Sequence, residues 1–231
     1  MSSEFGKNLR ISIFGESHGA AIGVVVDGLP VGETVDLDAL AAFLARRAPG
    51  RNAMSTARKK TDAVRVLSGL YQGKTSGAPL CMVIENRNAH SNDYERLRHI
   101  PRPAHADYSA SVRYHGFSDP NGGGHFSGRL TAPLCAAGGV CLQILNRKGI
   151  VIGGHLSRCA GVDDAPVDSL RLTAEELAAV AQRPIPVLDE NAGMRMQAAV
   201  QAAKEQGDSV GGVIEVFGLG IPAGLGSPMF G

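Results

Sequence analysis

The sequence predicts an α+β fold, arranged as a layered β-α-β sandwich of mainly antiparallel sheets around long buried helices. Strands and long helices do not alternate strictly along the chain, as they would in a doubly wound parallel sheet. Residues 131–148 are apolar on almost every face, which is typical of a buried central helix. The chain contains no internal repeat and no low-complexity linker, so we expect residues 1–231 to form a single domain.

The elements follow from local patterns. Residues 9–13 alternate and residues 23–27 contain three valines, so two strands flank the loop 15–20. Asp36 is a candidate N-cap for a helix over residues 37–44, because Leu37, Leu40 and Leu44 share one face. Further strands are predicted at 63–68, 79–85, 150–156 and 213–218, and further helices at 131–148, after the Thr173/Glu176 capping box, and around 196–203.

Composition excludes several classes of protein. A net charge of +1 gives no overall attraction to nucleic acid or to a membrane. The four cysteines form no CxxC pair and no apolar leader precedes them, so we expect a cytoplasmic protein without a metal site. The longest apolar run, residues 130–145, is interrupted by Gln143 and is too short to predict an integral membrane protein.

The first candidate site is the loop Gly15-Glu16-Ser17-His18-Gly19. It matches G-x-S-x-G, the nucleophile elbow of serine hydrolases, in which a helix follows the serine directly. Here the following residues instead predict a strand. A serine hydrolase that uses Ser17 is therefore a weak alternative.

Three further segments carry charge or glycine. Residues 46–65 hold seven basic side chains against the single acid Asp62, which fits either a solvated face or a site for a small phosphorylated substrate. No aromatic residue is interleaved for stacking on nucleic-acid bases.

His105 lies in the polar stretch 86–120 and is a candidate general acid. The glycines of 122–128 precede the buried helix, where backbone N–H groups attract anions.

Five ordered segments resemble the chorismate synthase family. They are FGESHGAAIGVVVDGLP (14–30), RRAPGRN (46–52), RPAHADY (102–108), GHFSGRLTAPLCAAGGV (124–140) and GDSVGGVIEV (207–216). The resemblance implies a homotetrameric lyase that forms chorismate by 1,4-anti elimination of phosphate from 5-enolpyruvylshikimate 3-phosphate. It also implies reduced FMN as cofactor, and NADPH as a candidate reductant of the flavin.

The resemblance also assigns roles to residues. His18 matches the histidine that protonates the leaving phosphate, and His105 matches the one that protonates or stabilises the reduced flavin. Ser17 and Ser127 match serines that donate hydrogen bonds near substrate and flavin. The set expected to contact the cofactor comprises His125, Phe126, Ser127 and Arg47. The set expected to bind the substrate comprises Arg47, Arg51 and Arg129.

The sequence also departs from the family pattern. Ala104 stands where the family commonly has glycine, and Ala53 stands where many members have arginine. We expect the chain to stop before the C-terminal portion of the family. The alternative function is therefore a catalytically inactive fragment that retains the anion-binding loops.

Overall fold

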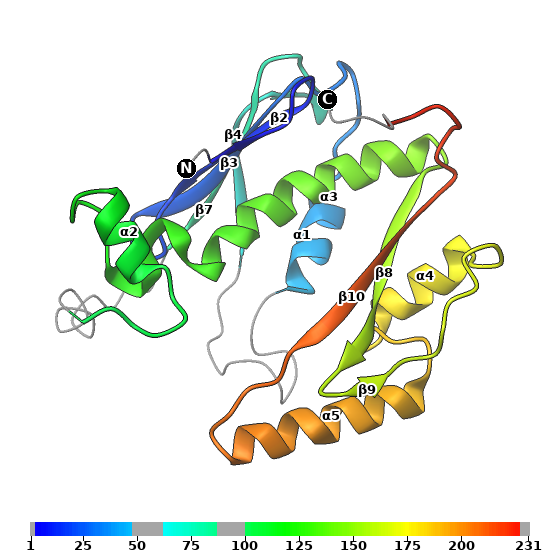
Figure 1. Cartoon of the computed structure of the whole chain (residues 1–231). Helices are drawn as coiled ribbons and strands as arrows, with labels where there is room; N and C mark the ends of the chain where they lie inside the picture. Colours follow the sequence, from blue (N-terminus) through cyan, green and yellow to red (C-terminus); the bar gives the residue numbers. More distant parts are fainter. Residues whose placement is uncertain (1–2, 48–61, 87–99, 227–231) are drawn as a thin grey trace. The chain divides into compact units, whose positions relative to one another are not determined.

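The computed structural model describes residues 3–47, 62–86 and 100–226 (Figure 1). The chain divides into two compact units. The first comprises residues 1–48 and 59–144, and the second comprises residues 49–58 and 145–231. The single domain expected from the sequence stays a prediction.

A five-stranded antiparallel sheet forms the frame of the first unit. Its strand order is β1-β2-β3-β7-β4. The strands are β1 (Glu4–Phe5), β2 (Arg10–Gly15), β3 (Ala21–Asp27), β7 (Leu80–Glu85) and β4 (Val64–Ser68). Gly15 pairs with Ile22, so the predicted loop is the connection of the β2–β3 hairpin. A separate two-stranded hairpin comprises β5 (Leu70–Tyr71) and β6 (Lys74–Thr75).

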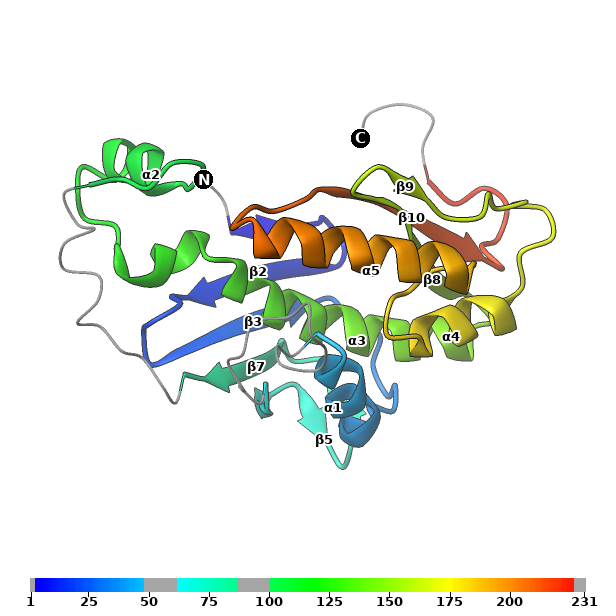
Figure 2. The same cartoon turned by 90° about the horizontal axis from the view of Figure 1, so that it is seen from below.

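One face of this sheet is the core of the unit. Successive residues of a strand point to opposite faces, and Ile22, Val24 and Val26 of β3 are at most 1% exposed. The helices α1 (Leu37–Ala45) and α3 (Thr131–Arg147) lie against this face, as Figures 1 and 2 show. Their buried side chains in the cluster are Leu40, Leu44, Ala136, Ala137, Val140 and Ile144.

Polar contacts fix the start of α1 against α3. The Asp36 carboxylate accepts hydrogen bonds from the N–H groups of Asp38 and Ala39, as predicted for an N-cap. The Gln143 amide donates to the Asp36 carbonyl at 2.9 Å and accepts from the Asp36 N–H at 2.8 Å. Gln143 therefore interrupts the apolar run of α3 because it binds the backbone of the neighbouring helix start.

Residues 100–130, which precede α3, contain more regular structure than their sequence predicts. They include the helix α2 (Asp107–Arg113) and two short 3₁₀ turns, η3 (Asn121–Phe126) and η4 (Gly128–Leu130). Helix α2 was missed because it buries only Ala110 and so shows no apolar periodicity.

The second unit holds a smaller antiparallel sheet with the order β10-β8-β9. Its strands are β8 (Val151–Cys159), β9 (Val162–Asp163) and β10 (Gly212–Leu219), and its helices are α4 (Ala174–Gln182) and α5 (Glu190–Glu205). Thr173 and Glu176 form the predicted capping box at the start of α4. The core cluster of this unit includes Met196 of α5 and Cys159 of β8, together with Ile185 and Val187.

The predicted α+β class with mainly antiparallel sheets is confirmed by these two units. Helix bounds agree with the sequence within a few residues, except that α5 begins at Glu190, ahead of the residues used to predict it. The helical segment Gly128–Arg147 is long and apolar enough to cross a membrane. Its buried residues instead pack in the core of the first unit.

Candidate functional site

The connection between β2 and β3 presents Ser17 and His18 beside the glycine segment. Ser17 is 8% exposed, and its N–H donates to the Gly124 carbonyl at 3.1 Å. The Gly19 N–H donates to the Glu16 carbonyl at 3.1 Å, which closes a tight turn around the two residues. A backbone hydrogen bond therefore joins two motifs that lie more than 100 positions apart in the sequence.

The imidazole of His18 lies directly against Gly122. A Cβ atom built on Gly122 would be 2.1 Å from both Nδ1 and Cε1 of His18, and 3.1 Å from Oγ of Ser17. Gly122 also has φ +60°, in the left-handed region that favours glycine. Both the backbone conformation and the approach of His18 require glycine at this position.

Two of the predicted arginines share one buried carboxylate. Asp62 has a side chain that is 1% exposed, and Oδ2 accepts from Nη1 of Arg47 at 2.5 Å. Its Oδ1 accepts from Nη1 of Arg129, whose side chain is 11% exposed. Nη2 of Arg47 also donates to the Thr131 hydroxyl at 3.1 Å. Two guanidinium charges therefore meet one carboxylate charge, which leaves this cluster with a net positive charge that favours an anion.

Asn86 connects this cluster with the loop that carries His18. It follows β7 directly, and its Nδ2 donates to the carbonyls of Glu16 and Gly19, each at 3.0 Å. Its Oδ1 accepts from Nε of Arg129 at 3.5 Å.

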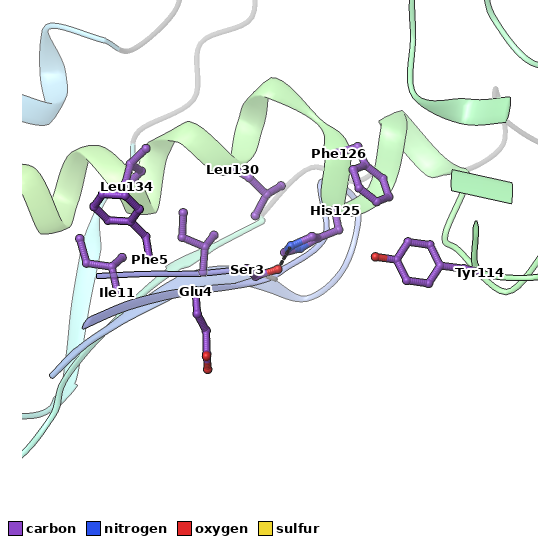
Figure 3. A pocket seen from close by; sticks show the side chains of 10 residues that line it. Ser3, Glu4, Phe5, Ile11, Tyr114, His125, Phe126, Leu130 and Leu134 are labelled. Carbon is purple, nitrogen blue, oxygen red and sulfur yellow. Dashed lines mark hydrogen bonds between the residues drawn. The ribbon is translucent and has the colours of Figure 1, made fainter. Parts of the chain in front are cut away.

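His125 and Phe126 face a mainly apolar cavity of about 540 Å³, shown in Figure 3. Nδ1 of His125 lies 2.8 Å from the Gly15 carbonyl, and Nε2 lies 2.7 Å from Oγ of Ser3. A carbonyl only accepts, so Nδ1 carries the hydrogen. The Phe126 ring lies 6.0 Å from that of Tyr114. The wall is completed by Glu4, Phe5, Ile11, Ile13, Leu130 and Leu134.

His105 is exposed in a loop held by an ion pair. Nδ1 of His105 donates to the Pro103 carbonyl at 3.1 Å. Nε and Nη2 of Arg102 donate to the Asp107 carboxylate at 2.8 and 2.9 Å. The hydrogen bond from Arg102 lowers the pKa of Asp107 to about 2. Ala104 has φ +59° in this loop, which explains why glycine suits the position.

The structure brings some of the predicted residues together and leaves others apart. Ser17 and His18 contact the glycine segment 122–124, and Arg47 meets Arg129 at Asp62. Within its own loop, His105 donates from Nδ1 to the Pro103 carbonyl and from its backbone N–H to the Arg102 carbonyl. Arg51 lies outside the described residues. No helix follows Ser17, because β3 begins at Ala21, so the nucleophile-elbow interpretation lacks the helix it requires.

Sequence reasoning missed the parts played by Asp62 and Asn86. Asp62 is the only acid among seven basic residues of 46–65, and this pattern indicates an ion pair with one of the neighbouring arginines. Asn86 is the first polar residue after an apolar strand. No local pattern indicates that its amide reaches the turn at Glu16 and Gly19.

The second unit holds a further buried polar network that the sequence did not indicate. His155 in β8 is 2% exposed, with Nδ1 2.7 Å from the Asp164 carboxylate and Nε2 2.9 Å from that of Glu215. Burial raises the pKa of Asp164. Hydrogen bonds from the N–H groups of Leu188 and Asp189 and from His155 outweigh that effect, so the pKa lies below its ordinary value.

Residues 9–231 match the family model described as chorismate synthase. A curated chorismate synthase from Lancefieldella parvula is 40% identical over 241 residues, which cover all of this chain and 63% of the relative. One from Thermococcus kodakarensis is 42% identical over 223 residues, which cover 96% of this chain and 60% of the relative.

A solved structure described as a crystal structure of chorismate synthase has the same fold. It superposes with a TM-score of 0.72 at 28% sequence identity, covering 96% of this chain and 61% of that one. This chain therefore spans about 60% of the length of the curated relatives that it matches.

Proposed function

The chain belongs to the chorismate synthase family, and from this premise we propose that it carries the phosphate-binding and proton-donating part of an enzyme that forms chorismate. The proposed reaction is the 1,4-anti elimination of phosphate from 5-enolpyruvylshikimate 3-phosphate. In this elimination a ring proton is lost and the bond from carbon to the phosphate oxygen breaks. Inorganic phosphate is the second product.

The observation that supports this proposal most strongly is the cluster of Arg47, Asp62 and Arg129. Asp62 holds both guanidinium groups by one nitrogen each, and each guanidinium has five N–H donors in a planar fork. Donors of both arginines are therefore left for a second anion. A substrate phosphate is a suitable anion because it accepts such paired hydrogen bonds.

His18 is the proposed proton donor to the leaving phosphate. A phosphate group departs more readily when it is protonated, and an imidazole is the side chain best suited to donate a proton near neutral pH. Gly122 fixes one side of the ring, so the orientation of His18 is set by the glycine segment. Ser17, which is buried beside His18, is proposed to donate a hydrogen bond to the substrate.

The predicted cofactor segment fits a flavin in part. The rings of Phe126 and Tyr114 and the aliphatic wall of the adjoining cavity suit a flat aromatic ring system. Both nitrogens of His125 already have partners, so its hydrogen-bonding capacity serves Ser3 and Gly15. The Ser127 hydroxyl accepts from the Arg129 N–H and keeps its own hydrogen to donate.

We propose that Phe126 and Ser127 contact FMN and that His105, exposed on its loop, protonates or stabilises the reduced form. Bound reduced FMN would supply an electron transiently. NADPH as the source of reduction and assembly into a homotetramer stay predictions.

Anaerobic incubation of the protein with 5-enolpyruvylshikimate 3-phosphate and photoreduced FMN tests this proposal, with chorismate measured by its absorbance. Formation of chorismate would support the proposed reaction. We expect His18→Ala to lower the rate of that reaction far more than it lowers substrate affinity, because a general acid acts in the transition state. An unchanged rate in His18→Ala would remove the role of His18.

The same experiment separates the alternative function. A catalytically inactive fragment that retains the anion-binding loops would bind the substrate saturably and form no chorismate. Phosphate release without chorismate would instead indicate hydrolysis, and labelling of Ser17 by a fluorophosphonate would then identify the nucleophile.

A further inference from the structure

Asn86 holds both ends of the turn that carries Ser17 and His18. Its side-chain Nδ2 donates to the carbonyls of Glu16 and Gly19, which stand before and after these two residues. Its own N–H donates to the Ala20 carbonyl at 3.1 Å. One residue at the end of β7 therefore provides three hydrogen bonds to a turn more than 65 positions earlier in the sequence.

The other side of the same amide points at the arginine cluster. Oδ1 of Asn86 accepts from Nε of Arg129, while Nη1 of Arg129 is bound to the buried Asp62. Two carbonyls on one side and a guanidinium on the other fix the orientation of the amide, since only the NH₂ group can face the carbonyls. Among side chains of this length, only asparagine offers two donors on one branch and an acceptor on the other.

We propose that Asn86 is a positioning residue, which sets the place of His18 relative to the anion site of Arg47 and Arg129. The inference rests on the proposed function, because it assigns His18 and the arginines to one substrate. Through Arg129, an anion bound at the cluster and the turn with His18 are joined by consecutive hydrogen bonds. Displacement of Asn86 therefore moves the proton donor, although Asn86 itself touches no reacting atom.

Asn86→Asp tests the inference with the smallest change of shape. The aspartate has no donor for the carbonyls of Glu16 and Gly19 when it is ionised, and its charge is repelled by both oxygens. We expect a shifted Cε1–H resonance of His18 in the NMR spectrum, identified by its absence from His18→Ala. We also expect about tenfold weaker binding of 5-enolpyruvylshikimate 3-phosphate, the scale of one lost hydrogen bond.

The dependence on pH distinguishes positioning from a general loss of structure. Below its own pKa, the new aspartic acid regains one donor. The His18 resonance of Asn86→Asp should therefore move back toward that of the unsubstituted protein, measured at the same pH, as the pH falls through that pKa. Asn86→Ala removes the same hydrogen bonds without a titratable group, so its altered resonance should show no such recovery.

Asn146→Asp is the matched control, because it makes the same chemical change at the exposed end of α3. It should leave the His18 resonance and the affinity unchanged. An unaltered His18 resonance in either Asn86→Asp or Asn86→Ala, with the fold retained by circular dichroism, would overturn the inference. If Asn86→Asp does not fold, Asn86→Ala decides the matter.

The NMR readout does not depend on turnover. Failure of the unsubstituted protein to bind the substrate would contradict the proposed function. The response of His18 to changes at Asn86 would still confirm or overturn the contact with the turn.

Discussion

Gly122 shows how one residue can be required by the backbone and by a neighbouring side chain together. Its φ of +60° is strained for any other residue except asparagine or aspartate, and the space where a Cβ would stand is taken by the ring of His18. The glycine segment thus sets the place of the imidazole as well as the course of the chain.

Gly122→Ala should therefore displace His18 and lower stability by about 2 kcal/mol, of which about 1 kcal/mol is backbone strain. Urea unfolding measures the stability, and the His18 resonance reports the displacement. Gly116→Ala is the control: Gly116 has φ +80° with nothing within 4 Å of its Cβ position, so it carries the strain alone. Equal losses in the two variants, with His18 unmoved, would contradict the close contact.

Asp107 provides a prediction for acid stability. Its pKa is about 2 in the folded protein against an ordinary 3.8, so the folded state binds this proton less readily than the unfolded state. The ion pair with Arg102 therefore contributes fully above pH 3.8, and its contribution is lost as the pH falls toward 2. Asp107→Asn should cost about 2 kcal/mol at pH 7.

Urea unfolding at pH 7, 4 and 3 checks this expectation, since the difference between Asp107→Asn and the unsubstituted protein should shrink at the lowest pH. Asp27→Asn removes the partner of an exposed ion pair with Arg10, and it should change stability by less than about 1 kcal/mol. A difference for Asp107→Asn that persists undiminished at pH 3 would mean that the charge of Asp107 is not the cause.

At the scale of elements, the second unit depends on a polar contact inside its sheet. His155 of β8 lies between Asp164 and Glu215, with Nδ1 beside the carboxylate of Asp164 and Nε2 beside that of Glu215. The contact with Glu215 joins β8 to β10. Asp164, which follows β9, also accepts hydrogen bonds from the N–H groups of Leu188 and Asp189, so its contact with His155 joins β8 to the turn before α5.

His155→Ala should lower the free energy of unfolding by about 3 kcal/mol, because it leaves a buried carboxylate without one partner and opens a cavity. Thermal or urea unfolding measures the loss. Arg171→Ala removes an exposed side chain of the same unit and is the control, with an expected change within about 0.5 kcal/mol. A loss at His155 no larger than that at Arg171 would show that the network contributes nothing to stability.

The elements could be predicted where burial imposes a period. Strand β2 was found because apolar and polar residues alternate in it, strand β3 because its consecutive valines favour a strand, and helix α3 because its apolar residues extend along the whole helix. Helix α2 was not found, since only Ala110 is buried. The strands β1, β5, β6 and β9 are two residues long each, which is too short for any period to appear.

The candidate site was predictable to a smaller extent, because its contacts are set by tertiary structure. Ser17, His18 and the glycine segment could be selected from motifs, but their contact at Gly122 joins residues that no local pattern relates. The role of Asn86 follows only from the tertiary structure, whereas Asp62 stands out in the sequence as the only acid among seven basic residues. Arg47 and Arg129 were expected as separate anion contacts, whereas the structure shows both on one carboxylate.

At the scale of the whole molecule, all described residues of the proposed site lie in the first unit. The sheet supplies the turn of His18 and the position of Asn86. The turn η4 supplies Arg129, and the start of α3 supplies Thr131. The chain spans about 60% of the length of its curated relatives. The activity of the whole enzyme therefore remains a proposal, while the anion site can be tested on this chain directly.

Calorimetric titration with 5-enolpyruvylshikimate 3-phosphate and with 5-enolpyruvylshikimate, which lacks the phosphate, tests the phosphate site at Arg47 and Arg129. We expect the phosphorylated compound to bind more tightly, and we expect Arg47→Ala to weaken its binding by about 1.5–3 kcal/mol, the scale of a charge-assisted hydrogen bond. Arg10→Ala, at an exposed ion pair, should leave the affinity unchanged. Equal affinity for the two compounds, unaffected by Arg47→Ala and by salt, would contradict a phosphate site at this cluster.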